Sequence, residues 1–208
     1  LERTTITPSP ANRSMLRSHP QMNLTESVAY CTQNAWFLGT TVRENILFGT
    51  EYNEERYREV LYACALEPDL DILEHHDETE VGEKGTSLSG GQKARIALAR
   101  SFYSYARHIL IDDALSAVDA QTAEHLYHHC FHGPLAKDRT IVLVTHSVSL
   151  VLPTAVYAVV MDNGRISAEG KPMDLIQTGR INSTLQDPVP VAPFFQAENS
   201  SSSEEEAK

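Results

Sequence analysis

The pentapeptide Leu88-Ser89-Gly90-Gly91-Gln92 is the most specific chemical pattern in the 208 residues. Ser89 offers a hydroxyl group, and the two glycines let the backbone approach an anion closely. The small, helix-forming residues that follow predict a helix beginning at about Gly91. Its free N–H groups and dipole would favour a phosphate, so the segment is a candidate phosphate-binding site. The alternative is a glycine-containing loop that only caps a helix.

Two acidic residues follow a short apolar segment, Ile109-Leu110-Ile111, which predicts a buried strand. Asp112 and Asp113 therefore stand at the carboxyl end of a strand, where open α/β sheets place ligand chemistry. Asp112 would hold Mg²⁺ through water, and Asp113 would face an attacking water. The alternative is a pair of solvated aspartates in a turn.

Two further polar residues stand at the ends of predicted strands. His146 follows the β-branched segment 140–145 and could contact a terminal phosphate or orient a water. Gln33 follows the alternating segment 27–32 and could ligate Mg²⁺ or orient water without a change of charge. Each of the two is a weak signal alone, because polar groups are common at strand ends.

The elements that would position these residues alternate between strands and helices. Thr41-x-x-Glu44 has the form of a capping box and predicts a helix over 42–48. Asn53 can cap a second helix, whose apolar stripe runs to about Ala65 and which Glu67-Pro68 stops, and a third helix is predicted over 120–131. The polar segment 71–85 is predicted as a loop, and Asp162-Asn163-Gly164 predicts a hairpin turn. Buried strands that alternate with helices predict an α/β layered sheet with an antiparallel hairpin near its end.

Composition and the prolines divide the chain. With 41% hydrophobic and 22% charged residues it is globular, and its net charge of −11 argues against a protein that coats nucleic acid. We expect a flexible lead-in over 1–26, a folded body over 27–186 and a disordered acidic tail over 187–208. No signal peptide or membrane span is expected, because the longest apolar stretch, 150–161, is too short. Three widely spaced cysteines favour a reducing compartment.

Taken in order, the motifs closely resemble the nucleotide-binding domain of ABC transporters over about residues 27–180. The resemblance makes Gln33 the Q-loop glutamine, 88–92 the signature, 109–113 the Walker B motif, Ser116-Ala117-Val118-Asp119 the D-loop and His146 the H-loop histidine. It implies a P-loop NTPase-like (RecA-like) α/β fold with a helical signature subdomain at about 34–105. It also implies ATP and Mg²⁺ as cofactors. The implied catalytic residues are Asp113, His146 and Gln33, the nucleotide contacts are Leu88, Ser89, Gly90, Gly91, Gln92 and Asp119, and the metal ligands are Asp112 and Gln33.

More narrowly, SVAYCTQNAWFLGTTVRENILFG and DDALSAVDA resemble the first nucleotide-binding domain of the C subfamily, the multidrug-resistance-associated and bile-acid type exporters. The stretch LYHHCFHGPL is similar to fungal members. This resemblance implies organic anions or conjugates as cargo. It also implies transmembrane domains and a second, head-to-tail nucleotide-binding domain as partners, on the cytoplasmic face of the vacuolar or plasma membrane.

The sequence departs from the family at the P-loop, G-x-x-x-x-G-K-[ST], whose backbone N–H groups and lysine hold phosphates. The only Gly-Lys pair is Gly170-Lys171, with Pro172 after it and Arg165 in place of the first glycine. We therefore expect a domain without the P-loop strand and helix, inactive alone and poorly soluble, which supplies the signature half of an ATP site. The alternatives are a non-catalytic truncated product or interaction module, and a soluble chromosome-maintenance or repair ATPase, whose heptad-patterned arms are absent.

Asp113 is a second departure from the family, because most ABC domains have glutamate at this position. The aspartate carboxylate is retracted by about one C–C bond, ~1.5 Å.

A cluster of histidines is a further feature of the sequence. His125, His128, His129 and His132 surround Cys130, and the His-x₃-His spacing could bind zinc. A solvated, histidine-rich helix face is the preferred interpretation, because the chain offers no matched second pair of ligands.

Overall fold

The computed structural model describes residues 28–82 and 88–181. The lead-in over 1–26, the tail over 187–208 and the first residue of the predicted strand 27–32 lie outside the described residues. The chain forms two compact units, Leu1–Val148 and Ser149–Lys208. All the candidate site residues belong to the first unit.

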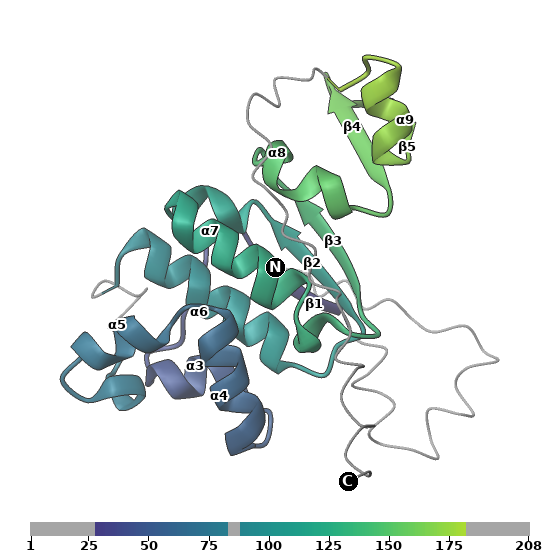
Figure 1. Ribbon diagram of the computed structural model, residues 1–208. Helices are drawn as coiled ribbons and strands as arrows, with labels where there is room; N and C mark the ends of the chain where they lie inside the picture. The colour runs from purple at the N-terminus through teal and green to yellow at the C-terminus, as the bar shows by residue number, and fades with distance from the viewer. Residues whose placement is uncertain (1–27, 83–87, 182–208) are drawn as a thin grey trace, which may run out of the picture. The chain divides into compact units, whose positions relative to one another are not determined.

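The first unit contains a parallel sheet of three strands in the order β1-β2-β3 (Figure 1). The strands are β1 (Val28–Cys31), β2 (His108–Asp112) and β3 (Thr140–Val144). Cys31 pairs with Ile111, and Asp112 pairs with Val144, so the three carboxyl ends lie at one edge. This confirms the three predicted strands, and their parallel order requires the helical connections that the sequence predicts between them.

The two faces of this sheet differ. Ile109, Ile111 and Cys31 are buried on the face against which α6 (Gly90–Tyr103) packs. The alternate residues are exposed, among them Val142 at 50% and Val144 at 59%. An apolar sheet face that stays this open favours self-association. The exposed valines of β3 therefore give a structural reason for the predicted poor solubility of the isolated chain, which stays a prediction.

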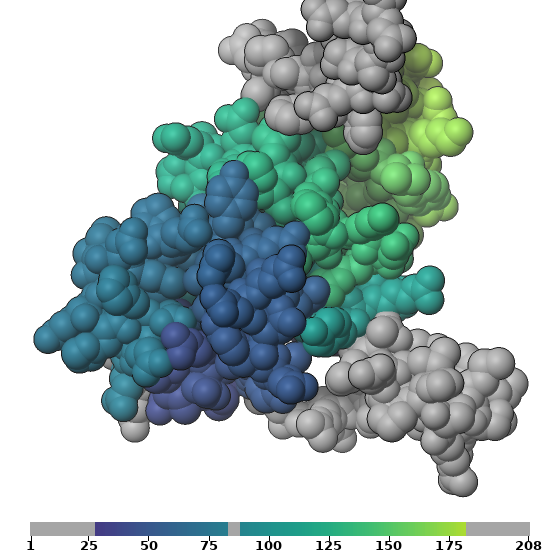
Figure 2. All heavy atoms as spheres, turned by 60° about the horizontal axis from the view of Figure 1, so that its bottom comes forward, coloured from purple at the N-terminus to yellow at the C-terminus, as the bar shows by residue number. Residues whose placement is uncertain are grey.

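The helices before the signature are short and capped. They are α3 (Val42–Leu47), α4 (Glu54–Ala63), α5 (Glu67–Ile72) and the 3₁₀ turn η1 (His76–Glu78). Thr41 and Asn53 cap α3 and α4 by accepting the backbone N–H groups of Glu44 and Arg56, as predicted. Figure 2 shows these segments, in blue, as one continuous surface.

Two predictions in this region are wrong. Glu67-Pro68 begins a helix instead of only ending one, because proline is tolerated in the first turn, where its missing N–H would have no partner. The segment 71–85 is therefore not a plain loop: it contains the end of α5, η1 and a bridge between Thr41 and Glu80. Residues 83–87 of that segment lie outside the described residues.

The helix predicted over 120–131 changes its form halfway. The α-helix α7 (Ala120–Leu126) continues as a π-helical segment, η4 (Tyr127–Phe131). The wider turn buries both Tyr127 and Cys130, and the Cys130 thiol donates to the Ala63 carbonyl at 3.1 Å. Two 3₁₀ turns, η3 (Ala114–Ala117) and η5 (Pro134–Ala136), flank the two segments.

The second unit contains the predicted hairpin. It pairs β4 (Ala158–Asp162) with β5 (Arg165–Gly170). The hairpin is preceded by α8 (Val148–Val151) and η6 (Leu152–Thr154), and it is followed by α9 (Pro172–Gln177). The first residue of α8 is also the last residue of the first unit. Asn163 and Gly164 both have positive φ, 48° and 75°, the conformation that a tight two-residue turn requires. Among the helices of the described ranges, none has both the length and the apolar character needed to cross a bilayer.

The buried thiol of Cys31 predicts a loss of stability at alkaline pH. Burial raises its pKa from the ordinary 9.0 to about 12. The folded chain therefore keeps a neutral thiol while the unfolded chain ionises, so this stabilisation is complete below pH 9 and is lost as pH rises towards 12. At pH 10.5 the loss is about 2 kcal/mol. Urea unfolding at pH 8 and 10.5 should show a smaller alkaline loss for Cys31→Ala, by this amount. An equal loss in both proteins would contradict the prediction.

Candidate functional site

The start of α6 forms a complete capping box around the candidate phosphate-binding residues. Ser89 is the N-cap, and its Oγ accepts the Gln92 N–H at 3.2 Å. The Gln92 side-chain Oε1 accepts the Ser89 N–H at 2.9 Å in return. The helix begins at Gly90, one residue before the predicted start. Because Ser89 Oγ acts as an acceptor in the cap, its own O–H proton is available to donate to an anion.

The two signature glycines have different surroundings. A Cβ added to Gly90 would meet nothing within 4 Å, so this side of the helix start is open. A Cβ added to Gly91 would lie 3.1 Å from the carbonyl oxygen of Ala117. Gly91 therefore allows the predicted D-loop, 116–119, to lie directly against the signature. The structure brings these two sequence motifs together.

At the carboxyl edge of the sheet the structure also brings Gln33 and Asp113 together. Gln33 Nε2 donates to Asp113 Oδ2 at 3.4 Å. Asp113 is 8% exposed, and its backbone N–H donates to the Val144 carbonyl at 2.9 Å. Its φ of 50° is left-handed, a conformation that aspartate tolerates better than most side chains. The other carboxylate oxygen, Oδ1, is buried and has no hydrogen-bond partner among the described residues.

The remaining predicted site residues lie around this edge. Asp112, the last residue of β2, accepts a hydrogen bond from the Tyr30 hydroxyl at 3.3 Å. Asp119 caps α7, and the hydrogen bonds that it accepts from Thr122 lower the pKa of its carboxyl. His146 is exposed just beyond β3, and within the described ranges its ring makes no hydrogen bond. The structure therefore joins Gln33 to Asp113 but does not join His146 to either.

The sequence profile of the ABC transporter family matches residues 7–116 of this chain. The chain belongs to the ABC transporter family. It is 48% identical, over 86% of its length, to "ABC transporter 7" of Pyricularia oryzae. It is 52% identical over 74% of its length to the "ATP-dependent bile acid permease" of Saccharomyces cerevisiae, and 54% identical over 75% to the "ABC transporter ATP-binding protein/permease VMR1" of the same yeast. The matched regions cover 11%, 9% and 10% of these relatives, so the chain corresponds to about a tenth of a full transporter.

Membership in the ABC transporter family fixes the broader fold as P-loop NTPase-like α/β. Domains of this family generally bind ATP with Mg²⁺. The relatives are membrane transporters, which agrees with a membrane-associated location for this domain as part of a full transporter.

Sequence reasoning missed Arg100, which ties the signature helix to the segment after Gln33. Its guanidinium donates to the Asn45 carbonyl at 2.7 Å, the Asn45 side chain at 3.1 Å and the Trp36 carbonyl at 3.1 Å. It also lies over the Trp36 ring, 4.6 Å from the centroid. Burial lowers the pKa of Arg100. No spacing rule finds such a residue, because its partners lie 55 and 64 positions away.

The histidine cluster packs against α4 instead of forming a fully solvated face. His125 Nε2 is 2.8 Å from the Tyr62 carbonyl oxygen, and the His129 ring is 5.0 Å from the Tyr62 ring. Burial, followed by the charges of His125 and His128, lowers the pKa of His129. In the part of the chain that the structure describes, no group of three or more His, Cys, Asp or Glu residues could hold a metal ion.

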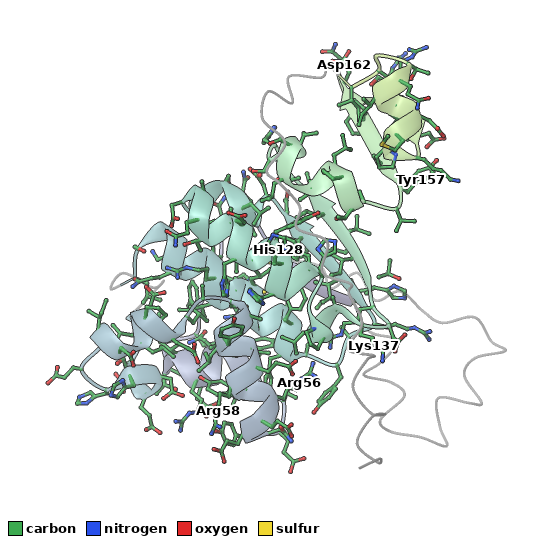
Figure 3. All side chains as sticks on the ribbon, viewed as in Figure 1. Arg56, Arg58, His128, Lys137, Tyr157 and Asp162 are labelled. Carbon is green, nitrogen blue, oxygen red and sulfur yellow. The ribbon has the colours of Figure 1, made fainter. Side chains whose placement is uncertain are left out.

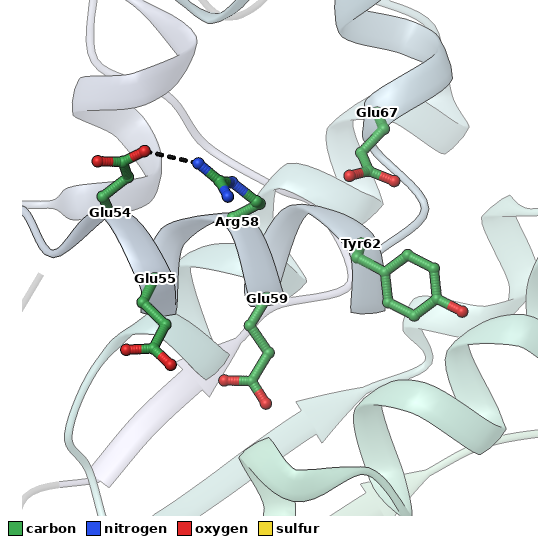
Figure 4. Close-up of a pocket in the computed structure, with 6 residues that line it drawn as sticks. All are labelled: Glu54, Glu55, Arg58, Glu59, Tyr62 and Glu67. Carbon is green, nitrogen blue, oxygen red and sulfur yellow. Dashed lines mark hydrogen bonds and ion pairs between the residues drawn. The ribbon is translucent and has the colours of Figure 1, made fainter.

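A shallow depression on α4 is lined by none of the predicted site residues (Figure 4). The depression is lined by Glu54, Glu55, Arg58, Glu59, Tyr62 and Glu67. Four of these six residues are acidic, and Arg58 is paired with Glu54 at 2.6 Å. Carboxylates repel phosphate groups, so this depression is unsuited to a nucleotide.

Proposed function

We propose that this chain supplies the signature face of a composite ATP site in a C-subfamily exporter. ATP binding and hydrolysis there would drive the export of organic anions or conjugates. The start of α6 carries the proposal. The Ser89 hydroxyl proton, the free N–H groups of the first helical turn and the open side at Gly90 all favour a polyphosphate. The similarity to the yeast ATP-dependent bile acid permease supports an organic-anion cargo.

The P-loop in this proposal comes from a second nucleotide-binding domain, arranged head to tail. The 208 residues contain no G-x-x-x-x-G-K-[ST] pattern, so the backbone cradle and the lysine for the phosphates lie outside them. The signature would then close on a nucleotide that the partner's P-loop holds. Mg-ATP binding by this chain alone is expected to be weak for the same reason.

The edge that carries Asp112 fits a magnesium ion. Asp112 offers a carboxylate, and Gln33 uses Nε2 for its contact to Asp113, so no described residue occupies its Oε1. Asp112 and Gln33 would hold the ion, which neutralises phosphate charge when bound. Asp113 would orient an attacking water, for which its buried Oδ1 would have to become accessible, and His146 would face the terminal phosphate.

The surface beside Gln33 suits contact with the transmembrane domains. Trp36, Leu38 and Phe48 expose 48%, 43% and 48% of their surface, and the Trp36 and Phe48 rings pack edge to face at 5.4 Å. Exposed aromatic groups on a fixed support are typical of protein interfaces. A full transporter of this type would place the domain on the cytoplasmic face of a vacuolar or plasma membrane.

A mixing experiment tests the proposal. The full chain is combined with a P-loop-bearing nucleotide-binding domain of an ABC transporter, and binding of a fluorescent ATP analogue with Mg²⁺ is measured. We expect the mixture to bind about tenfold more tightly than the partner alone, an effect of ~1.4 kcal/mol. Ser89→Ala should abolish the gain. Ser104→Ala, at the other end of α6, is the matched control and should keep it.

Two outcomes would contradict the proposal. The first is tight binding of the Mg²⁺-ATP analogue by the chain alone. The second is a mixture that binds no better than the partner domain, as expected of a non-catalytic interaction module.

A further inference from the structure

We propose that Asp69 is a positioning residue for the signature, because it selects the orientation of the Gln92 side-chain amide. The inference rests on the proposed function of the start of α6. Asp69 lies in α5, and its Oδ1 accepts a hydrogen bond from Gln92 Nε2 at 3.2 Å. Asp69 is 23 positions from Gln92 in the sequence, so the contact joins two separate elements.

The orientation of the Gln92 amide decides whether the capping box exists. With Oε1 towards Ser89, the amide accepts the Ser89 N–H at 2.9 Å. With the amide turned over, its NH₂ group would face that N–H, and two donors would meet. An ionised carboxylate only accepts hydrogen bonds, so Asp69 requires the NH₂ side of Gln92 and leaves the oxygen for Ser89.

Arg95 holds the Asp69 carboxylate in place. Its Nη1 lies 2.8 Å from Asp69 Oδ2, and both side chains are largely buried, at 15% and 17% exposure. Asp69 Oδ2 has no hydrogen-bond partner among the described residues, so this ion pair alone balances that oxygen. Arg95 also donates to the Ala65 carbonyl at 2.5 Å and to the Gly91 carbonyl at 3.3 Å. The positive charge of Arg95 therefore offsets the negative charge of Asp69, which reduces the repulsion between Asp69 and a phosphate at Ser89.

Two variants of Asp69 distinguish a role of its hydrogen-bonding chemistry from a role of its size. Asp69→Asn keeps the shape but adds a donor that can face Oε1 of a turned Gln92 amide. Asp69→Glu changes the length but keeps an acceptor-only carboxylate. A role in amide selection predicts that the glutamate variant works and the asparagine variant fails. A role in packing alone predicts the reverse.

Hydrogen–deuterium exchange of the full chain tests this independently of any nucleotide. In Asp69→Asn we expect the Ser89 and Gln92 amides, whose hydrogen bonds form the capping box, to exchange about tenfold faster, at the upper end of the effect of losing one neutral hydrogen bond. Exchange in α4 and α7 should stay unchanged. Asp69→Glu should exchange like the wild type, and so should Asp71→Asn, an exposed change on the same helix. Wild-type exchange at Ser89 and Gln92 in Asp69→Asn would overturn the inference.

The mixing experiment adds the functional readout. Asp69→Asn should remove most of the Ser89-dependent gain in affinity for the Mg²⁺-ATP analogue, and Asp69→Glu should retain it. If the wild-type mixture shows no gain, the proposed function fails, and the exchange data alone decide the role of Asp69. If the wild-type gain exists and Asp69→Asn retains it, the inference is overturned and the proposed function stands.

A compensating pair covers the case in which Asp69→Asn fails to fold. Gln92→Glu presents only acceptors to Asp69 and should be unfavourable alone. Combined with Asp69→Asn, it restores a donor opposite an acceptor and still accepts the Ser89 N–H. We expect the double variant to recover slow exchange at Ser89. No recovery relative to Gln92→Glu alone would overturn the inference.

Discussion

Replacing Arg56 by alanine is expected to lower the free energy of unfolding by about 3 kcal/mol. Arg56, in α4, closes the carboxyl end of the signature helix α6. Its Nε donates to the Tyr103 carbonyl at 2.9 Å, and its Nη2 donates to the carbonyls of Phe102 at 2.8 Å and Ser104 at 3.0 Å. The last carbonyls of a helix have no partner within the helix and carry its negative dipole end. One guanidinium thus binds the carbonyls of three consecutive residues at this helix end.

A second arginine limits the size of this loss. Arg139 donates to the carbonyls of Phe102 and Ser104. Burial, and secondly the charge of Arg56, lower the pKa of Arg139 to about 10. Removing Arg56 relieves that repulsion, so Arg139 recovers part of the lost stabilisation, and the sum of three charged hydrogen bonds is an overestimate.

Arg58 provides a matched control on the same helix. Arg56 and Arg58 are both labelled in Figure 3. The Arg58 side chain is 71% exposed, and among the described residues its one ion pair is the surface pair to Glu54. Arg58→Ala should change the free energy of unfolding by less than about 0.5 kcal/mol. Urea unfolding followed by circular dichroism measures both variants. Equal effects of the two changes would contradict the role of Arg56 at the helix end.

The parts of the fold that could be predicted from the sequence depend on local patterns. The three strands and the caps at Thr41 and Asn53 each depend on a few neighbouring residues, and the structure confirms them. The full burial predicted for β2 and β3 is wrong, because alternate residues of both strands are exposed on the open face of the sheet. The hairpin was also predicted, because Asn163 and Gly164 both tolerate positive φ. The motif order led to the ABC transporter family, which the sequence profile confirms.

The parts that could not be predicted depend on distant partners. Arg56, Arg95 and Arg100 look like ordinary polar positions of helices, yet each binds carbonyl groups of another element. The left-handed backbone of Asp113, with a φ of 50°, follows from how β2 ends beside β3 and not from its neighbours alone. The roles of Gln33, Asp112, Asp113, His146 and Asp119 in catalysis remain predictions.

Gly133→Ala is expected to lower the free energy of unfolding by about 3 kcal/mol, at the upper end of the range for steric overpacking. Gly133 follows the π-helical segment η4, and a Cβ at this position would lie only 2.0 Å from the carbonyl oxygen of His129. Its φ of −78° is ordinary, so the cost is a collision and not backbone strain. Either η4 must rewind or the chain after it must move.

The accessibility of the Cys130 thiol distinguishes a rewound η4 from a displaced chain after it. Cys130 lies in η4, is fully buried, and its Sγ is 3.5 Å from the Sγ of Cys64. If η4 rewinds in Gly133→Ala, Cys130 becomes accessible, and a thiol reagent should label it in the folded state faster than in the wild type. Gly39→Ala is the matched control, because a Cβ there meets nothing within 4 Å. That change should be neutral or stabilise the chain by up to ~1 kcal/mol, through the unfolded state. Equal stability of the two variants would show that the close approach at His129 is relieved without cost.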